Sequence, residues 1–336
     1  MKCFLFSITA LAVALAAGSS LATAQEPMII KFSHVVATDA PKHKAAEKFK
    51  ELAEKYTGGK VKVEIYPNSQ LFKDKEELEA LQLGSVHLLA PSTAKFGPLG
   101  VKEFEALDLP YLFKDEASYK KFADSPLAKD MLAKLDPKGI KGLAFWDNGF
   151  HIMGSNKPVR MVEDFKGMKL RIQSSKVLDA QTRAMGALPQ VMAFSELYQA
   201  LQTGVVDGAE NVPSNIFTQK LFEVMPNINV SHHGHLGYAV VANKKWWDGM
   251  TPEMRGHIEK AMTEAADLFA SIAKKENDDG LEQIKKTGKS KVHTQTEEER
   301  KNWIKALLPV HQEMEKRVGK ETIEALYKIT GFSATQ

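Results

Sequence analysis

The chain has 336 residues, of which 26% are charged and 43% hydrophobic, and its formal net charge is +3. This near balance excludes the strongly basic surface by which a protein binds nucleic acid. The chain is longer than a typical single core, so two lobes are expected. Cys3 is its single cysteine, which leaves the rest of the sequence without residues for disulfides, thiolate metal sites or thiol catalysis.

The first 24 residues are typical of a secretory signal peptide. Lys2 precedes the mainly apolar run Phe4–Ala17, and the small residues that follow end in an A-x-A cleavage pattern at Ala24. The apolar run is too short to span a membrane. We therefore expect cleavage after Ala24, export to the periplasm and a mature chain that starts at Gln25. Removal of Lys2 lowers the formal net charge to +2.

After this segment, strand and helix patterns alternate. Strand patterns are found at 28–36, 61–67 and 86–90. A helix with proline in its first turn is expected at Pro41–Tyr56. Asp74 and Glu77 have the spacing of a capping box ahead of a second helix. This β-α-β-α-β order predicts a parallel sheet covered by helices, with ligand sites beyond the carboxyl ends of the strands.

The rest of the chain continues the alternation. Strands are expected at 142–147, 151–155, 169–173, 205–211 and 236–247. Helices are expected at 175–186, 195–203, 251–286, 296–317 and 320–328. Gly280 is a candidate for a bend in the longest helix. No linker or repeat divides the sequence, so two lobes would be joined through strands or helices. The predicted class is α/β with two lobes.

Signatures of common enzymes and cofactor sites are absent from the sequence. It contains no G-x-S-x-G, H-E-x-x-H, Walker A or G-x-G-x-x-G motif, and no cofactor is expected. His232, His233 and His235 form a metal-like cluster, but adjacent histidines of a strand point to opposite faces, which favours a histidine-rich turn. Asp207 and Glu210 are candidates for acid–base catalysis, with solvation or capping as the alternative.

Polar residues are predicted near the ends of several strands: His34, Ser92, His151, Arg171, Glu210 and Asn211. Arg171 lies in an alternating strand, and Ser174 or Ser175 can cap the helix that follows. An arginine beside helix N–H groups can hold an anion, and a solvent-exposed arginine is the alternative. Phe194 either forms the apolar floor of such a site or packs into the core. Together these residues predict a cleft that binds a small anion by hydrogen bonds.

The segment KLRIQSSKVLDAQTRAMGALPQVMAFSELYQALQTGVVDGAEN (169–211) resembles the solute-binding subunits of tripartite ATP-independent periplasmic (TRAP) transporters. FSHVVATDAPKHKAAEKF, PNSQL, LDLPYLF and WDNGF support the resemblance in the same order. Among these subunits the chain is most similar to the DctP group, which binds four-carbon dicarboxylates. The resemblance implies a type II-like periplasmic-binding-protein fold, whose two α/β lobes are joined by crossing strands and a long helix.

The resemblance also implies a division of the chain and a set of partners. Lobe one is expected to comprise 25–148 and 237–278, and lobe two 149–236 and 279–330, with the ligand cleft between them. The expected ligand is a small carboxylate, foremost succinate, malate or fumarate. Membrane subunits driven by a sodium-ion gradient would receive it, and the receptor itself is expected to be a monomer.

Within this resemblance, individual residues acquire roles. Arg171 is implied to bind one ligand carboxylate through two parallel hydrogen bonds. Asn211 is implied to bind the same carboxylate, and Phe194 to pack on the ligand. His151 replaces the commoner basic residue and is expected to face a second carboxylate with a raised pKa, while a neutral structural histidine is the alternative. The turn AENVPSN lacks the large aromatic residue of many dicarboxylate binders, which leaves the exact acid open.

Three other functions stay open at this point. The receptor could bind another carboxylate, such as a 2-hydroxy, 2-oxo, aromatic or sugar acid. The protein could be an exported enzyme acting on an organic acid, with Asp207 or Glu210 as the base. It could also pass a ligand signal to a membrane histidine kinase. The resemblance favours a receptor without enzymatic activity.

Overall fold

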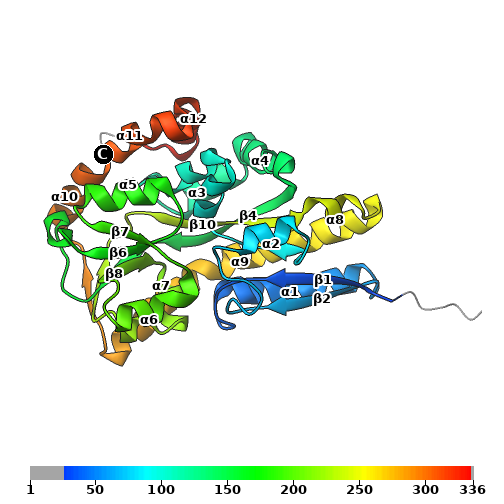
Figure 1. Ribbon diagram of the computed structural model, residues 1–336, viewed down its shortest axis with the longest axis horizontal. Coiled ribbons are helices and arrows are strands. Elements are labelled where there is room, and N and C mark those ends of the chain that lie inside the picture. The colour runs from blue at the N-terminus through cyan, green and yellow to red at the C-terminus, as the bar shows by residue number, and fades with distance from the viewer. Residues whose placement is uncertain (1–25, 334–336) are drawn as a thin grey trace, which may run out of the picture.

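The computed structural model describes residues 26–333, which form two α/β lobes, each built on its own sheet (Figure 1). The expected signal peptide lies outside the described residues. The first sheet contains β1 (Met28–Ser33), β2 (Val61–Tyr66), β3 (Leu88–Leu89), β4 (Ile140–Phe150) and β10 (His235–Asn243). Its spatial order is β2-β1-β3-β10-β4.

The first sheet begins with the predicted parallel unit. β1 runs parallel to β2 and β3, and β10 is antiparallel to both β3 and β4. Helix α1 (Pro41–Tyr56) connects β1 to β2, and α2 (Glu77–Gln82) precedes β3. Phe32 of β1 packs edge-to-face on Phe49 of α1, with ring centroids 5.9 Å apart. Burial of these rings holds the helix on the sheet.

The second sheet has the order β11-β9-β5-β8-β6-β7. Its strands are β5 (Ile152–Ser155), β6 (Lys169–Ile172), β7 (Leu188–Val191), β8 (Gly208–Asn211), β9 (Asn227–Val230) and β11 (Lys291–Thr294). Its helices are α5 (Lys176–Ala184), α6 (Leu197–Gln202) and α7 (Pro213–Thr218). Strands β7, β9 and β11 were not predicted from the sequence.

Crossing segments join the two sheets. His151 alone separates β4 from β5, and residues 231–234 link β9 to β10. Helix α9 (Pro252–Thr287) packs on α1 and β4 of the first lobe and on α7 of the second. In Figure 1 this helix, in yellow and orange, runs along both lobes. Two lobes joined by crossing strands and a long helix are confirmed, whereas the boundaries at 148/149, 236/237 and 278/279 stay a prediction.

The structure corrects one predicted helix and one predicted strand, and it gives Gly280 a packing role. Helix α9 is not interrupted at Gly280: a Cβ at this position would lie 3.2 Å from backbone atoms of Pro213, so the glycine permits close approach of α7. The helix expected at 296–317 is two helices, because Pro309 has no N–H to continue the first one. The last residues of the strand expected at 236–247 belong to a short helix.

The remaining helices lie mainly over the first lobe and at the C-terminal end of the described chain (Figure 1). They are α3 (Glu116–Ala123), α4 (Pro126–Ala133), α8 (Lys244–Asp248), α10 (Glu297–Leu307), α11 (Pro309–Val318) and α12 (Lys320–Thr330). Ser175 caps α5 by accepting a hydrogen bond from the N–H of Leu178. Between residues 26 and 333, no helix combines the length and apolar character required to cross a membrane.

Candidate functional site

Polar side chains from both lobes converge on a small cavity of about 30 Å³, here called the polar pocket. Four predicted site residues line it: Ser92, Arg171, Phe194 and Asn211. The other lining residues are Val35, Val36, Lys42, Asp74, Lys95, Gln173, Asn215, Leu236 and Tyr238. A larger cavity of about 500 Å³, between α3, β4 and α9, contains none of the predicted site residues. The converging polar groups therefore mark the polar pocket as the candidate site.

Arg171 is buried at the pocket, on strand β6, with 4% of its surface exposed. Its Nε donates a hydrogen bond to the carbonyl oxygen of Met192 at 3.1 Å, and its Nη2 lies 3.4 Å from Oδ2 of Asp74. Its guanidinium carbon is 5.6 Å from the ring centroid of Phe194. Within residues 26–333 these bonds use two of its five N–H donors. Arg171 is thus fixed in orientation while donors remain for a ligand.

Asp74 pairs with Arg171 and holds its guanidinium in place. The capping role predicted for Asp74 is wrong. Helix α2 has no side-chain cap. Oδ1 of Asp74 instead accepts a hydrogen bond from the N–H of Phe194 at 3.0 Å, and Oδ2 lies 2.9 Å from Nζ of Lys95. Burial opposes ionisation, but Lys95 and Arg171 hold the pKa of Asp74 below its usual range. Pairing with two buried cations outweighs the hydrogen bonds that a helix N-terminus offers.

Two lysines of the first lobe complete the charged part of the pocket. Lys95 also lies 3.3 Å from Oε1 of Glu77, whose own pKa is raised by burial. Lys42, with 2% of its surface exposed, donates to the carbonyl oxygen of Ala90 at 2.9 Å. Its ammonium lies 3.5 Å from the ring centroid of Tyr238. Both lysines follow strands of the parallel unit, at the edge where such sheets bind ligands.

An amide and phenol network orients the uncharged donors. Oδ1 of Asn211 accepts hydrogen bonds from the N–H of Val212 and from Nδ2 of Asn215, both at 2.9 Å. The NH2 group of Asn211 is therefore left to donate. The hydroxyl oxygen of Tyr238 accepts from Nδ2 of Asn148 at 2.8 Å and from Nδ2 of Asn215 at 3.3 Å. Its hydrogen is then also free to donate.

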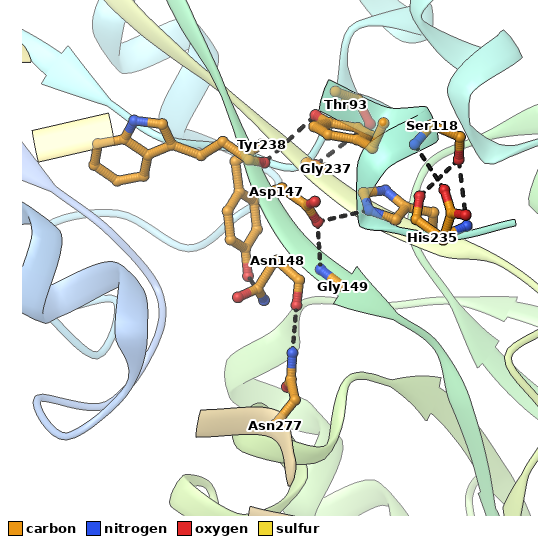
Figure 2. Close-up of polar contacts among 12 residues, drawn as sticks. Thr93, Ser118, Asp147, Asn148, Gly149, His235, Gly237, Tyr238 and Asn277 are labelled. Atoms are coloured by element: carbon orange, nitrogen blue, oxygen red, sulfur yellow. Dashed lines mark hydrogen bonds and ion pairs between the residues drawn. The ribbon is translucent and has the colours of Figure 1, made fainter. Parts of the chain in front are cut away.

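Asn148 connects this network to the long helix. Figure 2 shows the side chain of Asn148 beside the hydroxyl of Tyr238. The backbone carbonyl oxygen of Asn148 accepts a hydrogen bond from Nδ2 of Asn277, on α9, at 2.8 Å. The other amide atom of Asn277, Oδ1, accepts from the N–H of Ser214 at the start of α7 at 3.0 Å. The donors of the pocket are thus held by bonds between the lobes and the crossing helix.

Three predicted site residues do not line the polar pocket. Nε2 of His34 lies 3.0 Å from Nδ1 of His43, and the partly buried Ser174 precedes the true helix cap, Ser175. His151 is buried in the crossing between β4 and β5, with Nδ1 3.6 Å from Oε1 of Glu210. Burial lowers the pKa of His151 to about 4 in this structure, and the rise in pKa expected on binding of a dicarboxylate stays a prediction.

The two candidate catalytic carboxylates are likewise absent from the pocket lining. Oε2 of Glu210 lies 2.8 Å from Nε2 of His233 and 3.2 Å from Nε2 of Gln181. Asp207 accepts hydrogen bonds from the N–H of Lys169 at 2.8 Å and from Nδ2 of Asn156 at 2.9 Å. Both carboxylates are therefore engaged in holding strands and side chains in place.

The histidine cluster is also divided between separate partners. Whereas His233 pairs with Glu210, Nε2 of His235 lies 2.8 Å from Oδ1 of Asp147, a contact visible in Figure 2. His232 packs against the ring of Phe150. In the described part of the chain, no three His, Cys, Asp or Glu side chains are grouped so as to hold a metal ion.

Sequence reasoning missed the other nine lining residues, among them Lys42, Asp74, Lys95, Asn215 and Tyr238. A signal existed for the two lysines, since Lys42 follows the first strand and Lys95 the third, at the edge where a parallel sheet binds its ligand. The local pattern at Asp74 indicated a helix cap and not a pocket residue, because its partners Arg171 and Phe194 are 97 and 120 positions away.

Two lobes that enclose hydrogen-bond donors between them define the class of solute-binding proteins. The family of bacterial extracellular solute-binding proteins, family 7 (DctP), matches residues 32–317, and the chain belongs to this family. Its resemblance to the solute-binding subunits of TRAP transporters is thereby confirmed. Members of this family are periplasmic receptors.

Relatives with known names agree with this assignment. The chain is 59% identical to the C4-dicarboxylate-binding periplasmic protein DctP of Rhodobacter capsulatus, over 95% of this chain and 96% of the relative. A TRAP periplasmic solute-binding protein from Shewanella oneidensis, solved with bound succinate, is 38% identical with a TM-score of 0.88, over 90% of this chain and 99% of its own. One from Pseudomonas aeruginosa, with bound L-malate, is 38% identical with a TM-score of 0.83, covering 85% and 100%.

Proposed function

We propose that this TRAP receptor binds a four-carbon dicarboxylate such as succinate, malate or fumarate. The observation that carries the proposal is the convergence of free donors on one pocket: three N–H groups of Arg171 and the NH2 group of Asn211. Carboxylate oxygens are acceptors that match such a set. The succinate and malate complexes of the two similar structures support the choice of ligand.

The four predicted residues that line the pocket each have a role in this proposal. Arg171 binds one carboxylate through two parallel hydrogen bonds, and Asn211 donates to the same group. Phe194 packs on the carbon chain of the ligand. Ser92, whose oxygen accepts from the N–H of Ala94 at 3.3 Å, keeps its hydroxyl hydrogen for the ligand. His34, His151 and Ser174 hold the surrounding structure.

The receptor delivers its acid unchanged to membrane subunits driven by a sodium-ion gradient. It needs no cofactor, acts as a monomer, and reaches the periplasm after cleavage behind Ala24. Catalysis is not part of this proposal, because Asp207 and Glu210 are engaged elsewhere and absent from the pocket lining. Incubation with succinate, malate or fumarate should therefore return each acid chemically unaltered.

Substitution of Arg171 tests the proposal. Loss of the charged partner of a buried carboxylate costs about 2–5 kcal/mol, or roughly 30-fold to several thousandfold in affinity. Calorimetric titration with succinate should show this loss for Arg171→Ala. A smaller loss is expected for Arg171→Lys, because a point charge cannot form the two parallel bonds.

Arg183→Ala is the matched control. Arg183 is exposed on α5 and pairs with Asp179 four residues earlier at 2.8 Å, so its removal should leave affinity unchanged. An affinity of Arg171→Ala within threefold of the unmodified protein would contradict the proposed carboxylate contact. Parallel titrations with sugar, aromatic and 2-oxo acids would identify a different preferred carboxylate.

A further inference from the structure

Lys42 is a buried cation of the polar pocket without a carboxylate partner of its own. In the described part of the chain, the ion pairs at this pocket join Lys95 to Asp74 and Glu77 and Arg171 to Asp74, and none includes Lys42. The Lys42 ammonium contacts the carbonyl oxygen of Ala90 and the face of the Tyr238 ring.

Neither of these two contacts supplies a negative charge to balance the Lys42 ammonium. The carbonyl oxygen uses one of the three N–H donors, and the ring supplies a quadrupole rather than a counter-charge. Burial lowers the pKa of Lys42 to about 7, against the opposing effect of Glu77. A desolvated ammonium gains strongly from an anion at hydrogen-bond distance, because water does not weaken the pair.

The balance of charges around the pocket indicates that such an anion would belong to the ligand. Asp74 and Glu77 together balance the charges of Lys95 and Arg171, which leaves Lys42 as the net positive charge of the group. A monocarboxylate on Arg171 leaves Lys42 unpaired, whereas a dicarboxylate offers it a second carboxylate within the same small pocket.

We propose that Lys42 binds the second carboxylate of the ligand and so makes the receptor selective for dicarboxylates. This inference rests on the proposed function and deepens it. It also gives Lys42 the role that the sequence had assigned to His151, whose ring faces Glu210 instead. Tyr238, beneath the ammonium, supplies a hydroxyl hydrogen close to the same carboxylate.

A double-mutant cycle tests the assignment. Succinate is compared with succinamate, its monoamide, in which one carboxylate is replaced by a neutral group of nearly the same shape. The protein is compared with Lys42→Met, which keeps an unbranched apolar side chain but removes the charge. Calorimetric titration gives four dissociation constants, and their ratio isolates the coupling between Lys42 and the second carboxylate.

The expected coupling is about tenfold or more, as for other close charge pairs. The unmodified protein should prefer succinate to succinamate strongly, and Lys42→Met should bind the two with similar affinity. A purely structural role for Lys42 would weaken both ligands alike and leave their ratio unchanged, which would overturn the proposal.

Two further measurements make the result unambiguous. Lys48→Met removes a lysine from the same helix, where its ammonium pairs with Glu51 at 3.0 Å, and should preserve the succinate preference. If Lys42→Met does not fold, Lys42→Gln and the ligand comparison on the unmodified protein still apply, and equal affinity of that protein for succinate and succinamate would overturn the proposal. Failure of the unmodified protein to bind any dicarboxylate would contradict the proposed function itself.

Discussion

At the scale of single residues, the buried ionisable groups of this protein fall into two sets, those that line the polar pocket and those that do not. Lys42 and Arg171 line the polar pocket, whereas Glu210 and His151 do not. Burial opposes the charge of Glu210, but interactions with His151 and His233 lower its pKa to about 2. His151 itself is held neutral, because burial lowers its pKa to about 4.

The neutral state of His151 makes stability depend on pH. Its pKa is about 4 in the folded protein and 6.5 in the reference state, so the unfolded chain binds more protons below pH 6.5. Stability from this group is complete above pH 6.5 and is lost as pH falls towards 4. Between pH 7 and 5 the loss from His151 should be about 2 kcal/mol, measured by urea unfolding.

The matched variants are His151→Gln and His257→Gln. His257 is partly exposed on α9, outside the crossing between the lobes, so its replacement should leave the pH dependence as in the unmodified protein. His151→Gln cannot take up the proton and should lose less stability on acidification. The same decline in His151→Gln and the unmodified protein would show that other groups account for it.

At the scale of elements, helix α9 carries the contact between the lobes. Two of its glycines differ in surroundings. A Cβ added at Gly280 would lie 3.2 Å from backbone atoms of Pro213 and Ser214, whereas a Cβ added at Gly256 would meet no neighbouring atom within 4 Å. Helix α7, which begins at Pro213, also carries Asn215, the residue that orients Asn211. Close packing at Gly280 therefore extends to the pocket.

Alanine at these two positions should have opposite effects on stability. Gly256→Ala should raise the free energy of unfolding by about 1 kcal/mol, because alanine has the higher helix propensity. Gly280→Ala gains the same propensity but must displace the backbone of α7, and a net loss of about 1 kcal/mol is expected. Thermal and urea unfolding measure both. Stabilisation by Gly280→Ala would mean that α7 can shift to accommodate the added methyl group without loss of stability.

The displacement of α7 gives a second readout. Succinate affinity should fall in Gly280→Ala, since displacement of α7 moves Asn215, which orients Asn211 of β8, and it should be unchanged in Gly256→Ala. Equal succinate affinities of the two variants would show that the packing of α7 does not affect the geometry of the site.

At the scale of the whole molecule, the pocket lies where the lobes meet. Asp74 of the first lobe bonds Arg171 and Phe194 of the second, and Lys73 pairs with Glu196 at 2.8 Å across the same junction. A ligand that contacts both lobes binds the closed arrangement better than an open one, so it shifts the population towards closure.

Closure should be measurable in solution. Small-angle scattering should give a smaller radius of gyration with saturating succinate than without it. The folded state should gain about 2.7 kcal/mol at a free ligand concentration one hundred times the dissociation constant, which raises the melting temperature. Identical scattering curves in the two conditions would indicate a site that is rigid before ligand arrives.

The sequence by itself determined the class of fold and two central residues of the site. Alternation of short strands and amphipathic helices depends on neighbours in the chain, which is why the parallel unit β1-β2-β3 and helix α1 were predictable. Arg171 and Asn211 belong to one continuous segment that resembles a known family, so their presence at the pocket required no knowledge of distant contacts. Both the class of protein and the proposed carboxylate ligand followed from that segment.

Only the tertiary structure decided which other side chains join these residues. Asp74 has the spacing of a helix cap, yet its carboxylate pairs with Lys95 and Arg171, because two buried cations hold it more strongly than helix N–H groups. His151 follows the chain pattern of a ligand residue, but its ring faces Glu210 in the crossing between lobes. The role proposed for Lys42 depends on its having no carboxylate partner among residues 26–333, a property of three-dimensional packing that the order of residues does not record.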